Sequence, residues 1–112
     1  MPVPDPSQAP LGVFDSGVGG LTVVRALREL MPQESIVYLG DPARVPYGSK
    51  SPDTIRRFSV EDTQFLMGHG VKALVVACNT ATAHALPLLQ ATFRVPVIGV
   101  IEPGVEATLS DP

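Results

Sequence analysis

The chain has 112 residues, of which 45% are hydrophobic and 17% charged, with a mean hydropathy of +0.24; this fits one globular domain and excludes a disordered chain. Eight Lys and Arg against 11 Asp and Glu give a net charge of −3, and no basic run is interleaved with aromatic residues, so binding to nucleic acid or to an anionic membrane is disfavoured. The single cysteine, Cys78, excludes a disulfide or a multi-cysteine metal site within these residues, and we expect a cytoplasmic protein.

The first segment is rich in proline. Residues 1–10 contain four prolines and neither the basic nor the apolar region of a signal peptide, so we expect a flexible leader. Leu11–Phe14 then form an apolar run that stops at Asp15-Ser16-Gly17, which predicts a buried strand ending in a loop. The apolar residues of 20–31 follow helical spacing, and Pro32 closes this helix.

The middle of the chain continues this alternation. Ser35–Leu39 is the next expected strand, followed by a loop over 40–48. Ser51-Pro52 has the pattern of a helix cap followed by a first-turn proline, and the helix that it starts ends near Gly68–Gly70. We expect this helix to bury four large apolar side chains: Ile55, Phe58, Phe65 and Leu66.

Two more strands complete the pattern. Ala73–Ala77 and Val97–Ile101 predict strands, and residues 80–91 predict a helix in which Pro87 causes a kink or an early stop. Strands that alternate with helices, each a nearly continuous apolar run, are typical of a parallel sheet covered on both faces. We therefore predict a three-layer α/β/α fold with a mostly parallel sheet. The longest apolar run is about a third of the ~18 residues that a membrane span needs.

Polar clusters follow each predicted strand. These are Asp15-Ser16, residues 41–48, Cys78-Asn79-Thr80 and Glu102. In parallel α/β sheets, ligands bind at the carboxyl ends of the strands. We therefore expect the four clusters to meet at one edge of the sheet and to form a ligand site.

Cys78 is the candidate for chemistry at this edge. A lone cysteine is more often a buried structural thiol, but this one lies between a strand and a helix start, where backbone N–H groups favour a thiolate. Such a thiolate acts as a nucleophile or as a Brønsted base. His84 lies about 240° around the helix from Cys78, which disfavours a local dyad. We expect surface or packing roles for His69 and His84, and no metal site.

Asp15 and Ser16 precede a glycine-rich segment, residues 17–20. One interpretation is a helix cap and a tight turn. The other is a site for a ligand with an ammonium and a carboxylate, in which Asp15 pairs with the amine and backbone N–H groups bind the acid. The segment matches only two of the three glycines of a dinucleotide fingerprint. Pro46-Tyr47-Gly48 is a turn or a binding loop for a small anion, and Glu102 is a loop carboxylate or a site residue.

Four segments match one known family in order and with plausible spacing. They are GVFDSGVGGLTV (12–23), YLGDPARVPYGSKS (38–51), ALVVACNTATAHAL (73–86) and VPVIGVIEPG (95–104). On these motifs the chain resembles the amino-terminal part of the glutamate racemase family, in the aspartate/glutamate racemase superfamily. The resemblance covers nearly all of residues 11–104. It implies the first α/β domain of a two-domain racemase fold, with residues 105–112 starting a further segment.

The resemblance implies cofactor-independent interconversion of L- and D-glutamate, which supplies D-glutamate for peptidoglycan and so serves cell-wall biogenesis and cell shape. Two cysteines act on opposite faces of Cα, and Cys78 takes the place of one of them. Asp15 and Glu102 are implied to tune the thiols. The implied substrate contacts are Asp15, Ser16, Tyr47, Gly48, Asn79 and Thr80.

The family carries its second cysteine in a Cys-Thr-His motif of a second domain, whereas these 112 residues contain one cysteine. A single thiol returns a proton to the face from which it took it. We therefore expect these residues alone not to racemise glutamate at a useful rate. An open sheet edge or helix face in a half-enzyme favours association, so we also expect a homo-oligomer or aggregate.

Other interpretations stay open. A different enzyme of the same architecture, such as an aspartate or hydantoin racemase, shares the expected site. A one-thiol decarboxylase needs only one proton delivery and so fits a single cysteine. A non-catalytic module that binds glutamate or pairs with a partner chain is an alternative from another class, and a nucleotide-binding module is a third.

Overall fold

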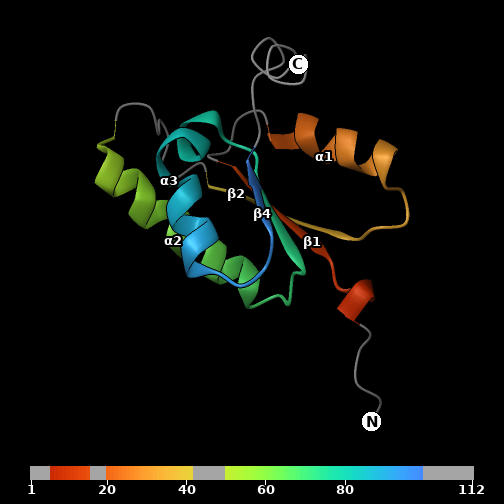
Figure 1. Cartoon of the computed structure of the whole chain (residues 1–112). Helices are drawn as coiled ribbons and strands as arrows, with labels where there is room; N and C mark the ends of the chain where they lie inside the picture. The colour runs from red at the N-terminus through yellow and green to blue at the C-terminus, as the bar shows by residue number, and fades with distance from the viewer. Residues whose placement is uncertain (1–5, 16–19, 42–49, 100–112) are drawn as a thin grey trace, which may run out of the picture.

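The structure is a computed structural model that describes residues 6–15, 20–41 and 50–99. Within these ranges, parallel strands form one sheet in the order β2-β1-β3-β4, and helices lie on both faces (Figure 1). The predicted α/β/α fold is therefore confirmed. The elements are η1 (Pro6–Gln8), β1 (Leu11–Asp15), α1 (Gly20–Leu30), β2 (Ile36–Gly40), α2 (Pro52–Met67), β3 (Ala73–Val76), α3 (Asn79–Thr92) and β4 (Val97–Gly99).

The two faces of the sheet carry separate clusters of buried side chains, because successive residues of a strand point to opposite faces. The α1-side cluster consists of three buried residues, Val13, Val75 and Ala77, against which Val23, Val24, Leu27, Ile36 and Tyr38 pack. The α2/α3-side cluster is larger. Its buried members are Phe14, Ile55, Leu66, Val71, Leu74, Val76, Cys78, Ala81, Ala85, Leu89 and Val97.

The start of α2 agrees with the sequence. Ser51 is the N-cap, its hydroxyl accepts a hydrogen bond from the Thr54 N–H at 3.2 Å, and Pro52 is the first helical residue. Proline suits this position because its missing N–H would have no partner within the helix. Phe65 was expected to point inward, but this is wrong, since 55% of it is exposed. It lies about 80° around the helix from buried Ile55 and contacts the ring of His69 instead, with centroids 4.8 Å apart.

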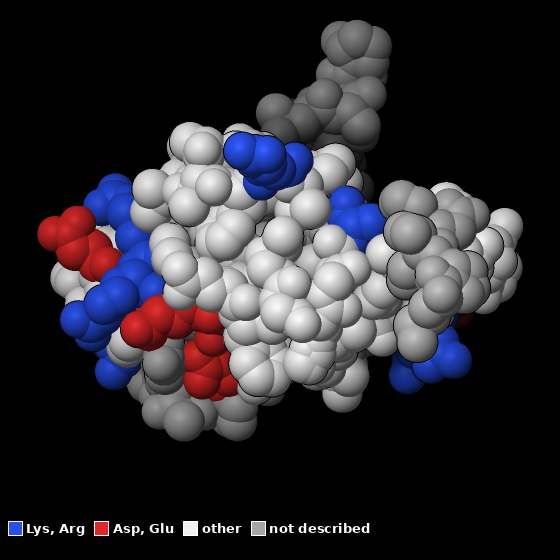
Figure 2. Space-filling view, turned by 90° about the horizontal axis from the view of Figure 1, so that it is seen from below, with Lys and Arg blue, Asp and Glu red and all other residues white. Residues whose placement is uncertain are grey.

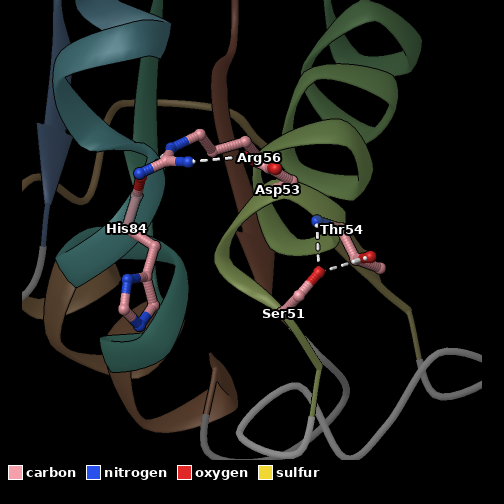
Figure 3. Close-up of polar contacts among 5 residues, drawn as sticks. All are labelled: Ser51, Asp53, Thr54, Arg56 and His84. Carbon is pink, nitrogen blue, oxygen red and sulfur yellow. Dashed lines mark hydrogen bonds and ion pairs between the residues drawn. The ribbon is translucent and has the colours of Figure 1, made fainter.

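Pro87 does not end its helix early, because α3 continues to Thr92. A proline inside a helix leaves the carbonyl four residues earlier without its usual donor. Two contacts hold the helix on either side of this break. Leu89 is fully buried in the α2/α3-side cluster, and Nε of Arg56 donates to the His84 carbonyl at 3.0 Å (Figure 3). Of the two outcomes expected for Pro87, a kink or an early stop, the early stop is therefore wrong.

The described part of the proline-rich segment is attached to the domain. Residues 6–8 form a 3-10 turn. The Lys72 ammonium donates to the Ser7 carbonyl at 2.7 Å, and the Lys72 backbone N–H donates to the Pro10 carbonyl at 2.8 Å. Lys72 also forms an ion pair with Glu34 at 2.6 Å. These contacts join the start of β1 to the start of β3.

The surface seen in Figure 2 has no basic face. Lys and Arg are scattered over this view, partly among Asp and Glu, and a broad area in its middle carries neither. Within the described ranges, no helix combines the length and the apolar character needed to cross a bilayer.

Candidate active site

Three of the predicted polar clusters have described residues at the carboxyl edge of the sheet. Asp15 ends β1 and is in register with Gly40 at the end of β2. The Asp41 N–H donates to the Asp15 carbonyl at 3.0 Å, and the Ala77 N–H donates to the Phe14 carbonyl at 2.8 Å. The ends of β1, β2 and β3 therefore lie side by side, and the expected meeting of these clusters at one edge is confirmed for the residues described.

Asp15 is fully buried at this edge. Its Oδ2 accepts a hydrogen bond from the Gly20 N–H at 2.8 Å and another from the Tyr38 hydroxyl at 3.2 Å. Its Oδ1 is also buried and has no hydrogen-bond partner among the described residues. A buried carboxylate oxygen without a donor is costly. The carboxylate therefore has one oxygen held by the protein and one ready for a further donor.

Gly20 is required at the start of α1. A Cβ built at this position would lie 2.6 Å from Oδ2 of Asp15, far inside van der Waals contact. The absence of a side chain lets the first N–H of the helix approach the carboxylate. Unpaired N–H groups and the helix dipole make such a helix start favourable for negative charge. The last glycine of the glycine-rich segment thus serves carboxylate binding within the protein.

Tyr38 reaches Asp15 from the neighbouring strand. It is half-buried in the α1-side cluster, and its hydroxyl contacts the carboxylate. Burial raises the pKa of the Tyr38 phenol above its ordinary value of 10.0, and the negative charge and hydrogen bond of Asp15 raise it further. The hydroxyl therefore stays protonated at neutral pH and acts as a donor.

Cys78 occupies the junction between β3 and α3. It is the N-cap of α3, with extended backbone angles of φ −119° and ψ 123°, and only 6% of it is exposed. Its carbonyl accepts the first bond of the helix, from the Thr82 N–H at 2.9 Å. Asn79, which is exposed, and Thr80, which is half-buried, are the first helical residues. The expected position of the thiol beside a helix start is confirmed.

The Cys78 thiol and the Asp15 carboxylate lie at this edge on different faces of the sheet. The Cys78 thiol packs in the α2/α3-side cluster, whereas the Asp15 carboxylate contacts Tyr38, which packs in the α1-side cluster. A ligand that touched both would lie across the ends of β1 and β3.

Four predicted site residues, Ser16, Tyr47, Gly48 and Glu102, lie outside the described residues, and their roles stay predictions. His69 is exposed beside Phe65, and His84 is half-buried with its carbonyl bound by Arg56. Among the described residues, no three His, Cys, Asp or Glu side chains are grouped as metal ligands.

Sequence reasoning missed Tyr38 and the role of Gly20. A signal for Tyr38 was present, since it is an aromatic residue with a polar group in an otherwise apolar strand. Val13 is paired with Tyr38, and Asp15 with Gly40. Residues two apart share a face, so Tyr38 lies on the same face as Asp15. That step needs the strand register, which the sequence did not show.

The chain is similar to known proteins in sequence and in structure. Residues 21–111 match the family Asp/Glu/Hydantoin racemase. Glutamate racemase of Geobacter metallireducens is 58% identical over 94 residues, which are 84% of this chain and 35% of the relative. The crystal structure of glutamate racemase from Thermus thermophilus in complex with β-chloro-D-alanine is 58% identical, with a TM-score of 0.85 over 94% of this chain and 41% of that chain.

A second similar structure is that of glutamate racemase from Francisella tularensis in complex with D-glutamate. It is 47% identical, with a TM-score of 0.82 over 90% of this chain and 39% of that chain. The chain therefore spans about two fifths of the length of these relatives. The family match over residues 21–111 includes β2, β3, β4 and Cys78 and spans most of the chain, and on this evidence the chain belongs to the Asp/Glu/hydantoin racemase family.

Proposed function

We propose that the chain forms the amino-terminal part of a glutamate racemase, in which Cys78 is one of two thiols that act on Cα of the substrate. The observation that carries the proposal is the position of Cys78 at the N-cap of α3, beside the edge that holds the buried Asp15. The identity to glutamate racemases and the D-glutamate bound to one of them support glutamate as the substrate.

The reaction begins with a proton transfer to sulfur. The Cys78 thiolate takes the α-proton, the Cα–H bond breaks, and the electron pair stays on Cα and is shared with the adjacent carboxylate. A second thiol on the opposite face then gives its proton to Cα, which inverts the configuration. The α-proton is a weak acid, so the site needs a placed base and fixed donors around the developing charge.

Asp15 holds the substrate in this scheme. Its Oδ1 is buried without a described donor, and the substrate ammonium supplies one as a charge-assisted hydrogen bond. Asn79 and Thr80 follow Cys78 at the start of α3 and offer side-chain polar groups beside the thiol. Ser16, Tyr47, Gly48 and Glu102 complete the proposed site, with Glu102 and Asp15 tuning the thiols.

A chimaera tests the proposal. In it, this chain takes the place of the matching 41% of the Thermus thermophilus racemase, so that the remainder of the relative supplies the second half. We expect the folded chimaera to interconvert L- and D-glutamate, and Cys78→Ser to abolish the inversion without unfolding the protein. Aspartate and a substituted malonate serve as alternative substrates. A folded chimaera that decarboxylates the malonate and leaves glutamate unchanged would overturn the assignment.

A further inference from the structure

The Asp15 carboxylate is held through one oxygen by two separate elements. The Gly20 N–H at the start of α1 and the Tyr38 hydroxyl on β2 both donate to Oδ2, at 2.8 and 3.2 Å. Neither of these two groups donates a hydrogen bond to Oδ1. Two donors on one oxygen orient the carboxylate plane, because rotation of the group would break at least one hydrogen bond to a buried charge.

The two donors are themselves fixed. Gly20 belongs to a helix, and its N–H direction follows from the helix axis. Tyr38 lies on a strand paired along its length with β1, and its ring packs in the α1-side cluster. Of the two Asp15 oxygens, Oδ1 is the one without a described donor. Asp15 lies at the carboxyl edge of the sheet, where ligands bind in such folds.

We propose that Tyr38 is a positioning residue of the racemase site: its hydroxyl holds Oδ2 of Asp15 so that Oδ1 receives the substrate ammonium. This inference rests on the proposed function. Tyr38 acts through Asp15 and does not touch the substrate. It determines how well the site accepts the amino group and has no direct part in binding the two substrate carboxylates.

The contact itself is tested by titrating the tyrosines of the chain, which has two, Tyr38 and Tyr47. Tyr47→Phe leaves one phenol, whose ionisation is followed by NMR of a ¹³Cζ label while folding is monitored in the same samples. We expect this phenol to titrate above 10, and the double variant Tyr47→Phe/Asp15→Asn to titrate at lower pH, because the charge and acceptor of Asp15 both favour the neutral phenol. An unchanged titration in the double variant would overturn the proposal.

The functional role is tested in the chimaera with a pair of ligands. Glutamate carries an amino group, and glutarate has the same two carboxylates without it. We expect Tyr38→Phe to raise KM for glutamate about tenfold, the size expected for one hydrogen bond to a charged group, and to leave the inhibition constant of glutarate within about twofold. A merely structural role would move both constants or neither, and either result would overturn the proposal.

Thr92→Val is the matched control. Its hydroxyl donates to the Leu88 carbonyl at 2.6 Å near the end of α3, so this variant also loses one side-chain hydrogen bond but not one at the site. We expect it to leave both constants unchanged. If the unmodified chimaera folds but does not racemise glutamate, the proposed function fails and the role of Tyr38 falls with it. If it racemises glutamate and Tyr38→Phe behaves like Thr92→Val, only the role of Tyr38 fails.

Discussion

The Asp15 carboxylate and the Cys78 thiol, the two candidate site groups, are held on different faces of the sheet by different forces. On the α1 side, the Asp15 carboxylate is fixed by hydrogen bonds from Gly20 and Tyr38, beside a small apolar cluster. On the α2/α3 side, the Cys78 thiol is packed within the large apolar cluster and its side chain makes no cap hydrogen bond. A charge needs directed donors, whereas a thiol tolerates apolar surroundings. We therefore expect the α2/α3 side to determine stability and the α1 side to determine how the substrate is oriented.

The largest expected effect is on stability, and two matched truncations measure it. Leu89→Ala deletes a fully buried side chain of the α2/α3-side cluster, so we expect it to lower the free energy of unfolding by about 2–5 kcal/mol. Leu27→Ala deletes the same atoms from a half-buried position on the α1 side, and we expect less than half that loss, because less apolar surface leaves the core. Urea unfolding measures both, and Leu30→Ala, at a position 78% exposed, is the control. Equal losses for Leu89 and Leu27 would contradict the asymmetry.

Gly20→Ala is the next in size and acts on the α1 side. The added methyl group would lie 2.6 Å from Oδ2 of Asp15, so α1 or the carboxylate must move. We expect a loss of about 1–3 kcal/mol in stability and a fall of about 100-fold in kcat/KM of the chimaera, since a small misplacement of a site group has an effect of that order. Leu21→Ala, at a position 69% exposed on the same helix, should change neither quantity. Full activity in Gly20→Ala would show that the position of Asp15 is not critical.

Arg56 provides a smaller test on the α2/α3 side. Its guanidinium joins α2 to α3 through the His84 carbonyl at 3.0 Å and also pairs with Asp53 at 2.9 Å (Figure 3). The Asp53 side chain is 96% exposed, and exposed ion pairs contribute little. We expect Arg56→Ala to lower the free energy of unfolding by about 1 kcal/mol and Asp53→Ala by no more than about 0.5 kcal/mol. Thermal unfolding compares them, and the reverse order would mean that the ion pair matters more than the carbonyl contact.

The smallest expected effect is a pH dependence from Tyr38. Its pKa is raised in the folded chain by burial and by Asp15, so the folded chain keeps the phenolic proton at a pH where the unfolded chain has lost it. The contribution to stability is complete below about pH 10 and is lost as the pH rises through the folded pKa. We expect unfolding measured from pH 8 to 11 to show a decline that is shallower in Tyr38→Phe. A decline of the same slope in both proteins would place its origin in other groups.

Much of the fold could be predicted because it follows from local patterns. Ser51-Pro52 starts α2 as expected, and Cys78 lies between a strand and a helix as expected. The predictions for individual residues were wrong where the packing of an element against its neighbours overrides the structural preference of the residue itself. Phe65 is apolar but lies on the exposed side of α2. Pro87 stays inside α3, where Leu89, two residues after it, is packed in the core.

The candidate site could be predicted only in part, for a related reason. The carboxyl ends of parallel strands meet at one edge, so Asp15 and Cys78 were found from the alternation of elements. Tyr38 was not, because its hydroxyl reaches Asp15 through the pairing of β2 with β1 and the register of that pair. The need for glycine at position 20 likewise follows from a distance to Asp15 and not from a turn motif.

The most direct test of the central claim is enantiomer-resolved Cα–H exchange by the chimaera in deuterated buffer. NMR would follow L- and D-glutamate separately, in the unmodified protein and in Cys78→Ser. If Cys78 is the base on one face of Cα, the unmodified chimaera should exchange and invert both enantiomers. Cys78→Ser should stop the inversion and confine any remaining exchange to the enantiomer whose proton faces the second thiol. Inversion that persists in a folded Cys78→Ser protein would contradict the account.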